Sequence, residues 1–253
     1  MPRSTTNPDP IHPSPDPSDD ALALSKLEER LPPLLSIVAG MVDVTGFLAL
    51  GNIFTAHITG NLVVVAAEAV RGGPLHLAQT LAIPVFIVAL AAVWLLARAS
   101  ACRRSELARL LLLVQFLLLS VLLTFSVIMK PSANPRGLMA GIAVMIAVSA
   151  MACQYALFRL AIPGAISTAV MTGNLTNAVL SLMEKLSPSR PLMTVDTGRL
   201  KRSLQLLGGF LLGCGVAAAA ISWLGDWAWS LPAALSGIAV ALPSSSSSAT
   251  RRR

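Results

Sequence analysis

The chain has 253 residues, of which 55% are hydrophobic and 12% are charged, and its mean hydropathy is +0.72. Soluble domains carry about 25% charged residues, so this composition excludes a soluble globular protein and indicates an integral membrane protein. The net charge of +7 does not indicate a nucleic-acid partner, because the basic residues lie mostly between apolar runs, where membrane topology accounts for them. The three cysteines lie far apart and indicate neither a disulfide framework nor a zinc site, and no cofactor is expected.

The two ends of the chain differ from its middle. Residues 1–33 are polar and rich in proline, which predicts a disordered cytoplasmic tail. Asp19 and Asp20 could begin a short interfacial helix that Pro32 and Pro33 would end, and a solvated linker is the alternative. Residues 243–253 are serine-rich and then arginine-rich, which predicts a second disordered tail at the anionic inner surface of the membrane.

Six apolar runs between these tails are long enough to predict membrane-spanning helices, which need about 20 residues. They comprise residues 34–50, 78–97, 110–129, 138–157, 204–224 and a shorter last run, 227–242. Two further stretches, residues 53–70 and 166–186, are less apolar and ambiguous. We therefore expect an all-α integral membrane protein, a bundle of six to eight transmembrane helices in a membrane domain over residues 34–242.

The two ambiguous stretches carry a repeated motif. Residues 51–62, GNIFTAHITGNL, return 113 positions later as GAISTAVMTGNL, residues 164–175, with eight of twelve positions identical. This match predicts an internal duplication, with one repeat over about residues 34–129 and the other over about residues 138–242.

The distribution of Lys and Arg separates two topologies, because these residues concentrate in cytoplasmic loops. If both motif stretches cross the membrane, there are eight spans and the basic residues divide 14 inside to 5 outside. If both stretches dip in and return, there are six spans and the division is 16 to 3. The second division modestly favours broken or re-entrant helices, and it would make the repeats inverted rather than parallel.

The Thr-Gly-Asn sequence that closes each motif is suited to a break in a membrane helix. Its glycine allows a positive φ and close approach, and its polar side chains can bond to freed backbone or to a ligand. A helix that begins at the asparagine would be capped there. The alternative is that these small and hydroxyl residues only allow tight helix packing. The predicted substrate-binding residues in the motifs are Thr55, Thr59, Gly60 and Asn61, and Thr168, Thr172, Gly173 and Asn174.

Two ionisable residues in or near the first motif complete the predicted site. Asp43 lies in the middle of the first span, where an ionised carboxylate is costly unless it is paired or hydrated. His57 has no counterpart in the second motif, where Val170 stands. We expect both to act as coupling or proton-handling groups, with a structural histidine as the alternative for His57.

The run 204–224 contains a Gly-x-x-x-Gly pattern at Gly209 and Gly213. Such a face packs closely on another helix, and here it predicts either a homo-oligomer contact or a contact between the repeats. No zinc-protease, serine-hydrolase or nucleotide-binding motif occurs, so an enzyme is not expected.

The segment GMVDVTGF, residues 40–47, followed by FTAHITGN, residues 54–61, resembles the opening signature of the YoaK family. The resemblance implies a multi-pass protein of the bacterial inner membrane, and it extends in layout over about residues 34–242. That family supplies no substrate. Because the two repeated Thr-Gly-Asn breaks would meet near the midplane, the leading hypothesis is a secondary transporter or permease for an unknown small solute, with its N-terminus in the cytoplasm. A non-transporting membrane scaffold or accessory subunit is the alternative.

Overall fold

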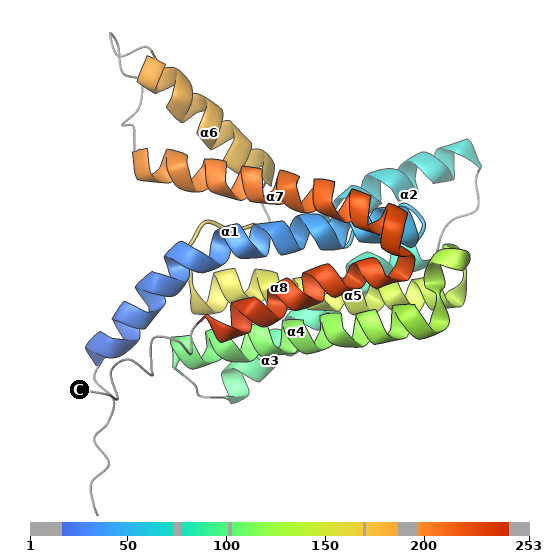
Figure 1. Cartoon of the computed structure of the whole chain (residues 1–253), viewed down its shortest axis with the longest axis horizontal. Coiled ribbons are helices and arrows are strands. Elements are labelled where there is room, and N and C mark those ends of the chain that lie inside the picture. The colour runs from blue at the N-terminus through green and yellow to red at the C-terminus, as the bar shows by residue number, and fades with distance from the viewer. Residues whose placement is uncertain (1–16, 73–76, 101–102, 169–170, 187–196, 243–253) are drawn as a thin grey trace, which may run out of the picture.

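The computed structural model describes residues 17–72, 77–100, 103–168, 171–186 and 197–242, and every regular element in these ranges is a helix (Figure 1). The elements are α1 (Pro17–Ala49), α2 (Gly60–Arg71), α3 (Leu77–Ala99), α4 (Arg104–Met129), η1 (Pro131–Ala133), α5 (Leu138–Ala156), the π-helical η2 (Leu157–Ala161), α6 (Met171–Leu186), α7 (Thr197–Leu224), η3 (Gly225–Trp229) and α8 (Ser230–Ala241).

Five helical stretches are long and apolar enough to cross a membrane. Four of them are the part Leu24–Ala49 of α1, then α3, α4, and α5 together with η2. The fifth, Thr197–Ala241, contains α7, η3 and α8, and α8 runs back in the opposite direction to α7 (Figure 1). Each predicted apolar run thus coincides with a helix. In contrast, α2 with 12 residues and α6 with 16 lie outside these stretches and are shorter than the about 20 residues that a span needs. Helix α8 also has 12 residues, but it continues from η3 within the fifth stretch.

The helices pack around α5, which is mostly buried, whereas α3 is mostly exposed. Both α3 and α4 pack against α5, and α8 packs against α4 and α1. The first helix, α1, packs chiefly against α7. Much of the core consists of small side chains, including Ala143, Ala147 and Ala150 of α5, so the helices can approach closely.

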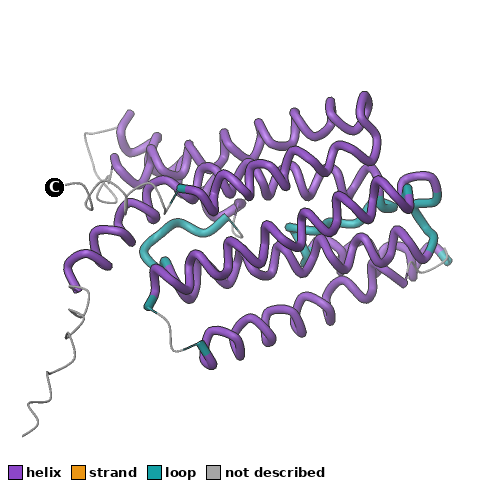
Figure 2. Tube along the Cα trace, turned by 60° about the horizontal axis from the view of Figure 1, so that its bottom comes forward, coloured by secondary structure: helices purple, strands orange, loops and turns teal. Residues whose placement is uncertain are grey.

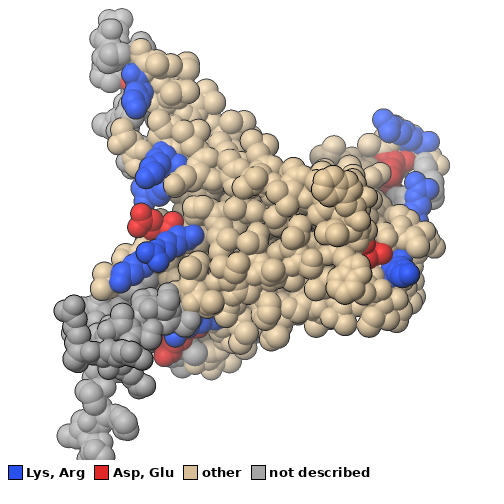
Figure 3. Space-filling view, viewed as in Figure 1, with Lys and Arg blue, Asp and Glu red and all other residues tan. Residues whose placement is uncertain are grey.

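The two short helices lie at opposite ends of the bundle. The first described residues of α1 and the last of α8 lie at one end, together with the outer end of α6, while α2 lies at the other end (Figure 1). Figure 2 shows the non-helical segments before α2 and α6 entering the bundle from these opposite ends. On the face shown in Figure 3, charged side chains gather at the two ends and the middle is uncharged. This distribution fits a bundle that crosses a membrane along its length.

The prediction that Pro32 and Pro33 end a helix is wrong, and so is the prediction of disorder for residues 17–33. Helix α1 runs unbroken from Pro17 through both prolines to Ala49. A proline inside a helix costs about 3 kcal/mol. The neighbouring leucines, Leu31 and Leu35, are fully buried, and their burial offsets this cost. Residues 1–16 and the predicted tail 243–253 lie outside the described ranges.

The Gly-x-x-x-Gly face of α7 is covered by α1 of the same chain. A Cβ atom placed on Gly213 would lie 2.2 Å from the Ile37 carbonyl oxygen, and one on Gly209 would lie 3.0 Å from that of Pro33. A Cβ atom placed on Gly40 of α1 would in turn lie 2.3 Å from the Phe210 carbonyl oxygen. Gly209 and Gly213 therefore pack on α1 within the chain, and an oligomer contact through them stays a prediction.

Candidate functional site

The first motif loop, residues 50–59, is fastened to the carboxylate of Asp43. Asp43 lies on α1 and is 5% exposed. Its Oδ1 accepts backbone N–H bonds from Thr55 and Ala56, each at 2.9 Å, and a longer one from His57 at 3.4 Å. Three consecutive amides therefore converge on one carboxylate oxygen, and these bonds replace the water that a buried charge would otherwise need. Asp43 holds a non-helical loop in place inside the bundle.

His57 occupies the other oxygen of this carboxylate. Its Nδ1 lies 2.7 Å from Asp43 Oδ2, within hydrogen-bond distance, and an ionised carboxylate would accept a proton-bearing Nδ1 there. The imidazole is 33% exposed while the carboxylate is 6% exposed. The ring also meets Phe210 of α7 edge-on, with centroids 5.2 Å apart. The pair thus joins a buried carboxylate to a partly accessible ring, and its predicted role in proton handling stays a prediction.

Asn61 binds both backbone groups of Phe54 in the same loop. Phe54 donates its N–H to Asn61 Oδ1 at 2.9 Å, and Asn61 Nδ2 donates to the Phe54 carbonyl at 2.7 Å. Asn61 is fully buried, so this pairing satisfies backbone that no helix satisfies. The predicted cap at Asn61 is wrong, because α2 begins at Gly60, with Thr59 in the N-cap position and without a side-chain cap bond.

Gly60 allows a close contact with the Phe54 side chain and does not adopt an unusual backbone conformation. Its φ is not positive, and among the described residues the positive-φ glycines are Gly51, Gly72 and Gly225. A Cβ atom on Gly60 would lie 3.0 Å from the ring of Phe54. The glycine therefore lets the Phe54 side chain pack on the start of α2, and the expectation of a positive φ is wrong.

The second motif makes a related but simpler contact. Asn174 Nδ2 donates to the Ser167 carbonyl at 3.1 Å, seven residues earlier, the same spacing as between Asn61 and Phe54. The asparagine is 4% exposed. Helix α6 begins at Met171, so Thr172, Gly173 and Asn174 lie in its first turn and the predicted helix start at Asn174 is wrong.

Neutral amides hold the second loop where a carboxylate holds the first. Gln154 Nε2 lies 3.0 Å from Thr168 Oγ1 and 3.0 Å from the carbonyl oxygen of Leu35 on α1. Gln115 of α4 donates to Gln154 Oε1 at 2.7 Å. All three polar side chains are buried. Gln115 and Gln154 thus join α4 to α5 through an interhelical hydrogen bond.

Both loops bind consecutive residues of α5. Next to Gln154, the hydroxyl of Tyr155 donates to the carbonyl of Ala56 at 2.6 Å. The first loop is therefore held by Tyr155 and the second by Gln154, so the two motifs meet the same level of one buried helix. Sequence reasoning missed Tyr155. Its signal was available, because it is the single tyrosine of the chain and lies inside an apolar run beside a glutamine.

The ten predicted site residues divide into three groups. Asp43, Thr55 and His57 form one cluster, in which the Thr55 hydroxyl also donates to the Val42 carbonyl at 2.9 Å. The second group comprises Asn61, Thr168 and Asn174, whose side chains bind the loops, and Gly60 and Gly173, which lie at the starts of α2 and α6. The side chains of Thr59 and Thr172 are exposed and lie outside these clusters. Within the described ranges, no group of three or more His, Cys, Asp or Glu side chains is placed to hold a metal ion.

Comparison with known proteins adds a family to this geometry. Residues 31–242 match the family described as "Protein of unknown function (DUF1275)". A 30-residue segment is 60% identical to the UPF0700 transmembrane protein YoaK of Bacillus subtilis (strain 168), and it covers 12% of this chain and 13% of that protein. No solved structure matches. Because the family match covers most of the chain and the resemblance to YoaK proteins is confirmed, this multi-pass membrane protein belongs to the DUF1275 family.

Proposed function

We propose that this protein is a secondary transporter or permease for a small solute, with its site at the two motif loops. The observation that carries the proposal is their convergence: loops from opposite ends of the bundle bind Tyr155 and Gln154, which are consecutive on α5. Transporters commonly build their sites near the midplane from broken helices of two repeats. Non-helical backbone at that depth is tolerated only where protein buries it or a water-filled cavity lines it.

The arrangement of the ends supports the six-span topology and an inverted relation between the repeats. Both ends of the described chain lie at one end of the bundle, and the six-span topology places 16 of the 19 basic residues there, tails included. The positive-inside rule then puts that end in the cytoplasm of a bacterial inner membrane. Arg71 at the end of α2 and Lys130 after α4 belong to the opposite, outer end.

This orientation predicts the labelling of two single cysteines by a membrane-impermeant thiol reagent, in a background that lacks Cys102, Cys153 and Cys214. A cysteine replacing Arg71 should react in intact cells, because α2 returns to the outer surface. A cysteine replacing Arg104, at the start of α4, should react only after the cells are opened. The reverse pattern is the one that eight spans predict, and it would contradict the six-span topology. Equal labelling of both positions in intact cells would contradict it as well.

The transport proposal predicts that Asn61→Leu and Asn174→Leu together abolish solute flux while the protein still inserts. Asn61 makes two bonds to Phe54 and Asn174 makes one to Ser167, so Asn61→Leu should cost more flux than Asn174→Leu. Flux is measured from the light scattering of proteoliposomes after an osmotic step with glycerol, urea or sodium formate. Asn177→Leu, on α6 but outside the motif, is the matched control. Unchanged flux in the double variant would rule out this site.

The scaffold alternative rested on the glycine pattern of α7 together with basic cytoplasmic loops, and the first of these two features is accounted for within the chain. Its proposed docking face was the glycine pattern of α7, and that face is covered by α1 within the chain. No described surface favours it over transport.

A further inference from the structure

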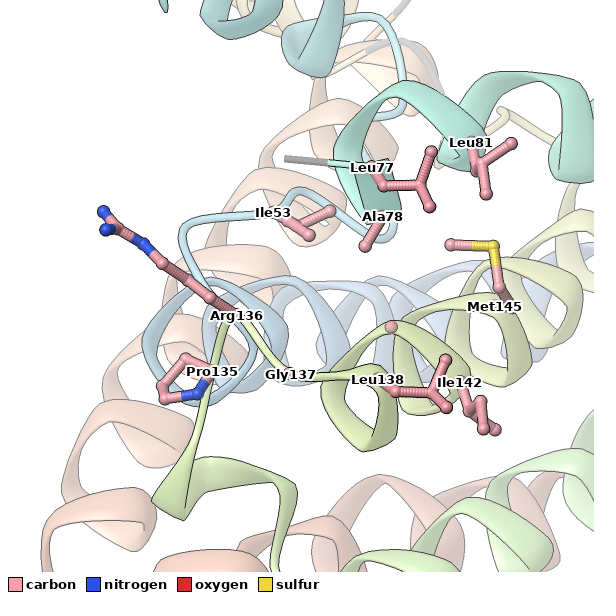
Figure 4. Close-up of a pocket in the computed structure, with 11 residues that line it drawn as sticks. Ile53, Leu77, Ala78, Leu81, Pro135, Arg136, Gly137, Leu138, Ile142 and Met145 are labelled. Atoms are coloured by element: carbon pink, nitrogen blue, oxygen red, sulfur yellow. The ribbon is translucent and has the colours of Figure 1, made fainter. Parts of the chain in front are cut away.

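A groove of about 380 Å³ lies beside the first motif loop (Figure 4). Its walls come from the first turns of α3 and α5 and from the link between η1 and α5. Leu77 and Leu81 line it from α3, and Leu138, Ile142 and Met145 line it from α5. It touches the first motif loop at Ile53, but none of the ten predicted site residues lines it.

The lining of this groove is apolar except at one end. Leu77 is 72% exposed and Leu138 is 75% exposed, so the groove opens on the outer surface of the bundle. Leu138, Ile142 and Met145 are spaced along one face of α5 over about 10 Å. This length of apolar wall begins at the ends of two membrane-spanning helices, where the hydrocarbon of a bilayer meets its headgroups.

Arg136 supplies the charge at the end of the groove. Figure 4 shows its side chain extending away from the apolar walls. The residue is exposed, and no Asp or Glu is among the described residues that line the groove. A guanidinium at this position is suited to a phosphate, which it can bind through two parallel N–H bonds.

We propose that this groove holds a phospholipid, with one acyl chain along α5 and its phosphate at Arg136. The membrane supplies this molecule, and its two parts match the two parts of the groove. The inner wall of the groove is Ile53, which is 1% exposed and lies two residues before Thr55, where Asp43 holds the loop. The bound chain therefore packs directly on the first motif loop. The proposal does not depend on transport.

Photocrosslinking in vesicles tests this proposal. The full chain, with benzoylphenylalanine replacing Leu81 in the groove, is reconstituted in equal amounts of phosphatidylcholine and phosphatidylglycerol, and crosslinked lipids are identified by mass spectrometry. The control carries the same group in place of Leu117, an exposed residue of α4 outside the groove. We expect phosphatidylglycerol to be enriched about fivefold at position 81 over position 117, because one arginine near the surface favours an anionic lipid by about that factor.

Two variants separate the headgroup from the chain. Arg136→Gln should remove the enrichment but keep lipid crosslinking at position 81. Gly141→Phe fills the groove floor, where a Cβ atom would be 3.6 Å from Ala78, and should reduce crosslinking to lipid. The same lipid composition at both positions would overturn the proposal. Crosslinking of position 81 to a second protein chain in place of lipid would also overturn it.

Discussion

Asp43→Ala is expected to lower the free energy of unfolding by about 3–5 kcal/mol, the range found when one partner of a buried charged network is removed. The substitution leaves the N–H groups of Thr55 and Ala56 unpaired in a buried loop, and it leaves His57 without its carboxylate. The measurement is thermal unfolding of the purified protein. Unfolding is detected as the buried Cys153 becomes exposed and reacts with a thiol-reactive fluorophore. Cys102 and Cys214 are replaced by alanine for this purpose.

Asp43→Asn separates the two roles of this carboxylate. The amide keeps an oxygen that can accept from the loop amides, but it loses the ionic partner of His57. We therefore expect a smaller loss than for Asp43→Ala. Glu184→Gln, near the end of α6, is a control for a carboxylate far along the chain. If Asp43→Asn destabilises the protein as much as Asp43→Ala, the charge and not the bonds to the loop amides holds the loop.

Hydropathy predicted the spans well because length and composition alone decide whether a helix can cross a bilayer. The error at Pro32 and Pro33 has a physical cause. Local rules treat two prolines as the end of a helix, but the buried leucines on either side favour continuation. Packing against α1 comes from α7 and α5, which are distant in the sequence. The residues around the prolines therefore do not show whether packing outweighs the tendency of proline to end a helix.

The sequence indicated which residues belong to the site, but it did not indicate which of them contact one another. Asp43 and His57 stood out as ionisable groups in apolar surroundings, which is a local property. Their contact depends on the path of the intervening loop. The bond from Tyr155 to Ala56 joins residues 99 positions apart, so only the packing of α5 against the loop reveals it. The motif asparagines were expected to cap helices, yet Asn61 pairs with Phe54, because buried loop backbone needs partners more than the exposed helix start does.

The close contact of α1 and α7 predicts a large difference between two glycines five positions apart on α7. Gly213→Ala should cost about 3 kcal/mol, the upper part of the range for overpacking, because the new Cβ atom would lie 2.2 Å from the Ile37 carbonyl. That oxygen belongs to backbone, so no side-chain rotation relieves the contact and the helices must separate. Gly208→Ala meets nothing within 4 Å and should stabilise the helix by up to about 1 kcal/mol. Thermal unfolding of the two variants measures the difference.

A double substitution tests whether Gly40 and Gly213 contribute to the contact between α1 and α7 independently of each other. Gly40→Ala meets the Phe210 carbonyl from the other helix, at 2.3 Å, so alone it should resemble Gly213→Ala. Once either alanine has separated α1 from α7, the second alanine finds more space. The double variant should therefore lose less unfolding free energy than the sum of the two single losses. If the two losses of unfolding free energy are strictly additive, the two contacts relax independently of each other. If Gly213→Ala proves as stable as Gly208→Ala, α1 and α7 do not approach this closely in the membrane, and the face of Gly209 and Gly213 is free for a different partner.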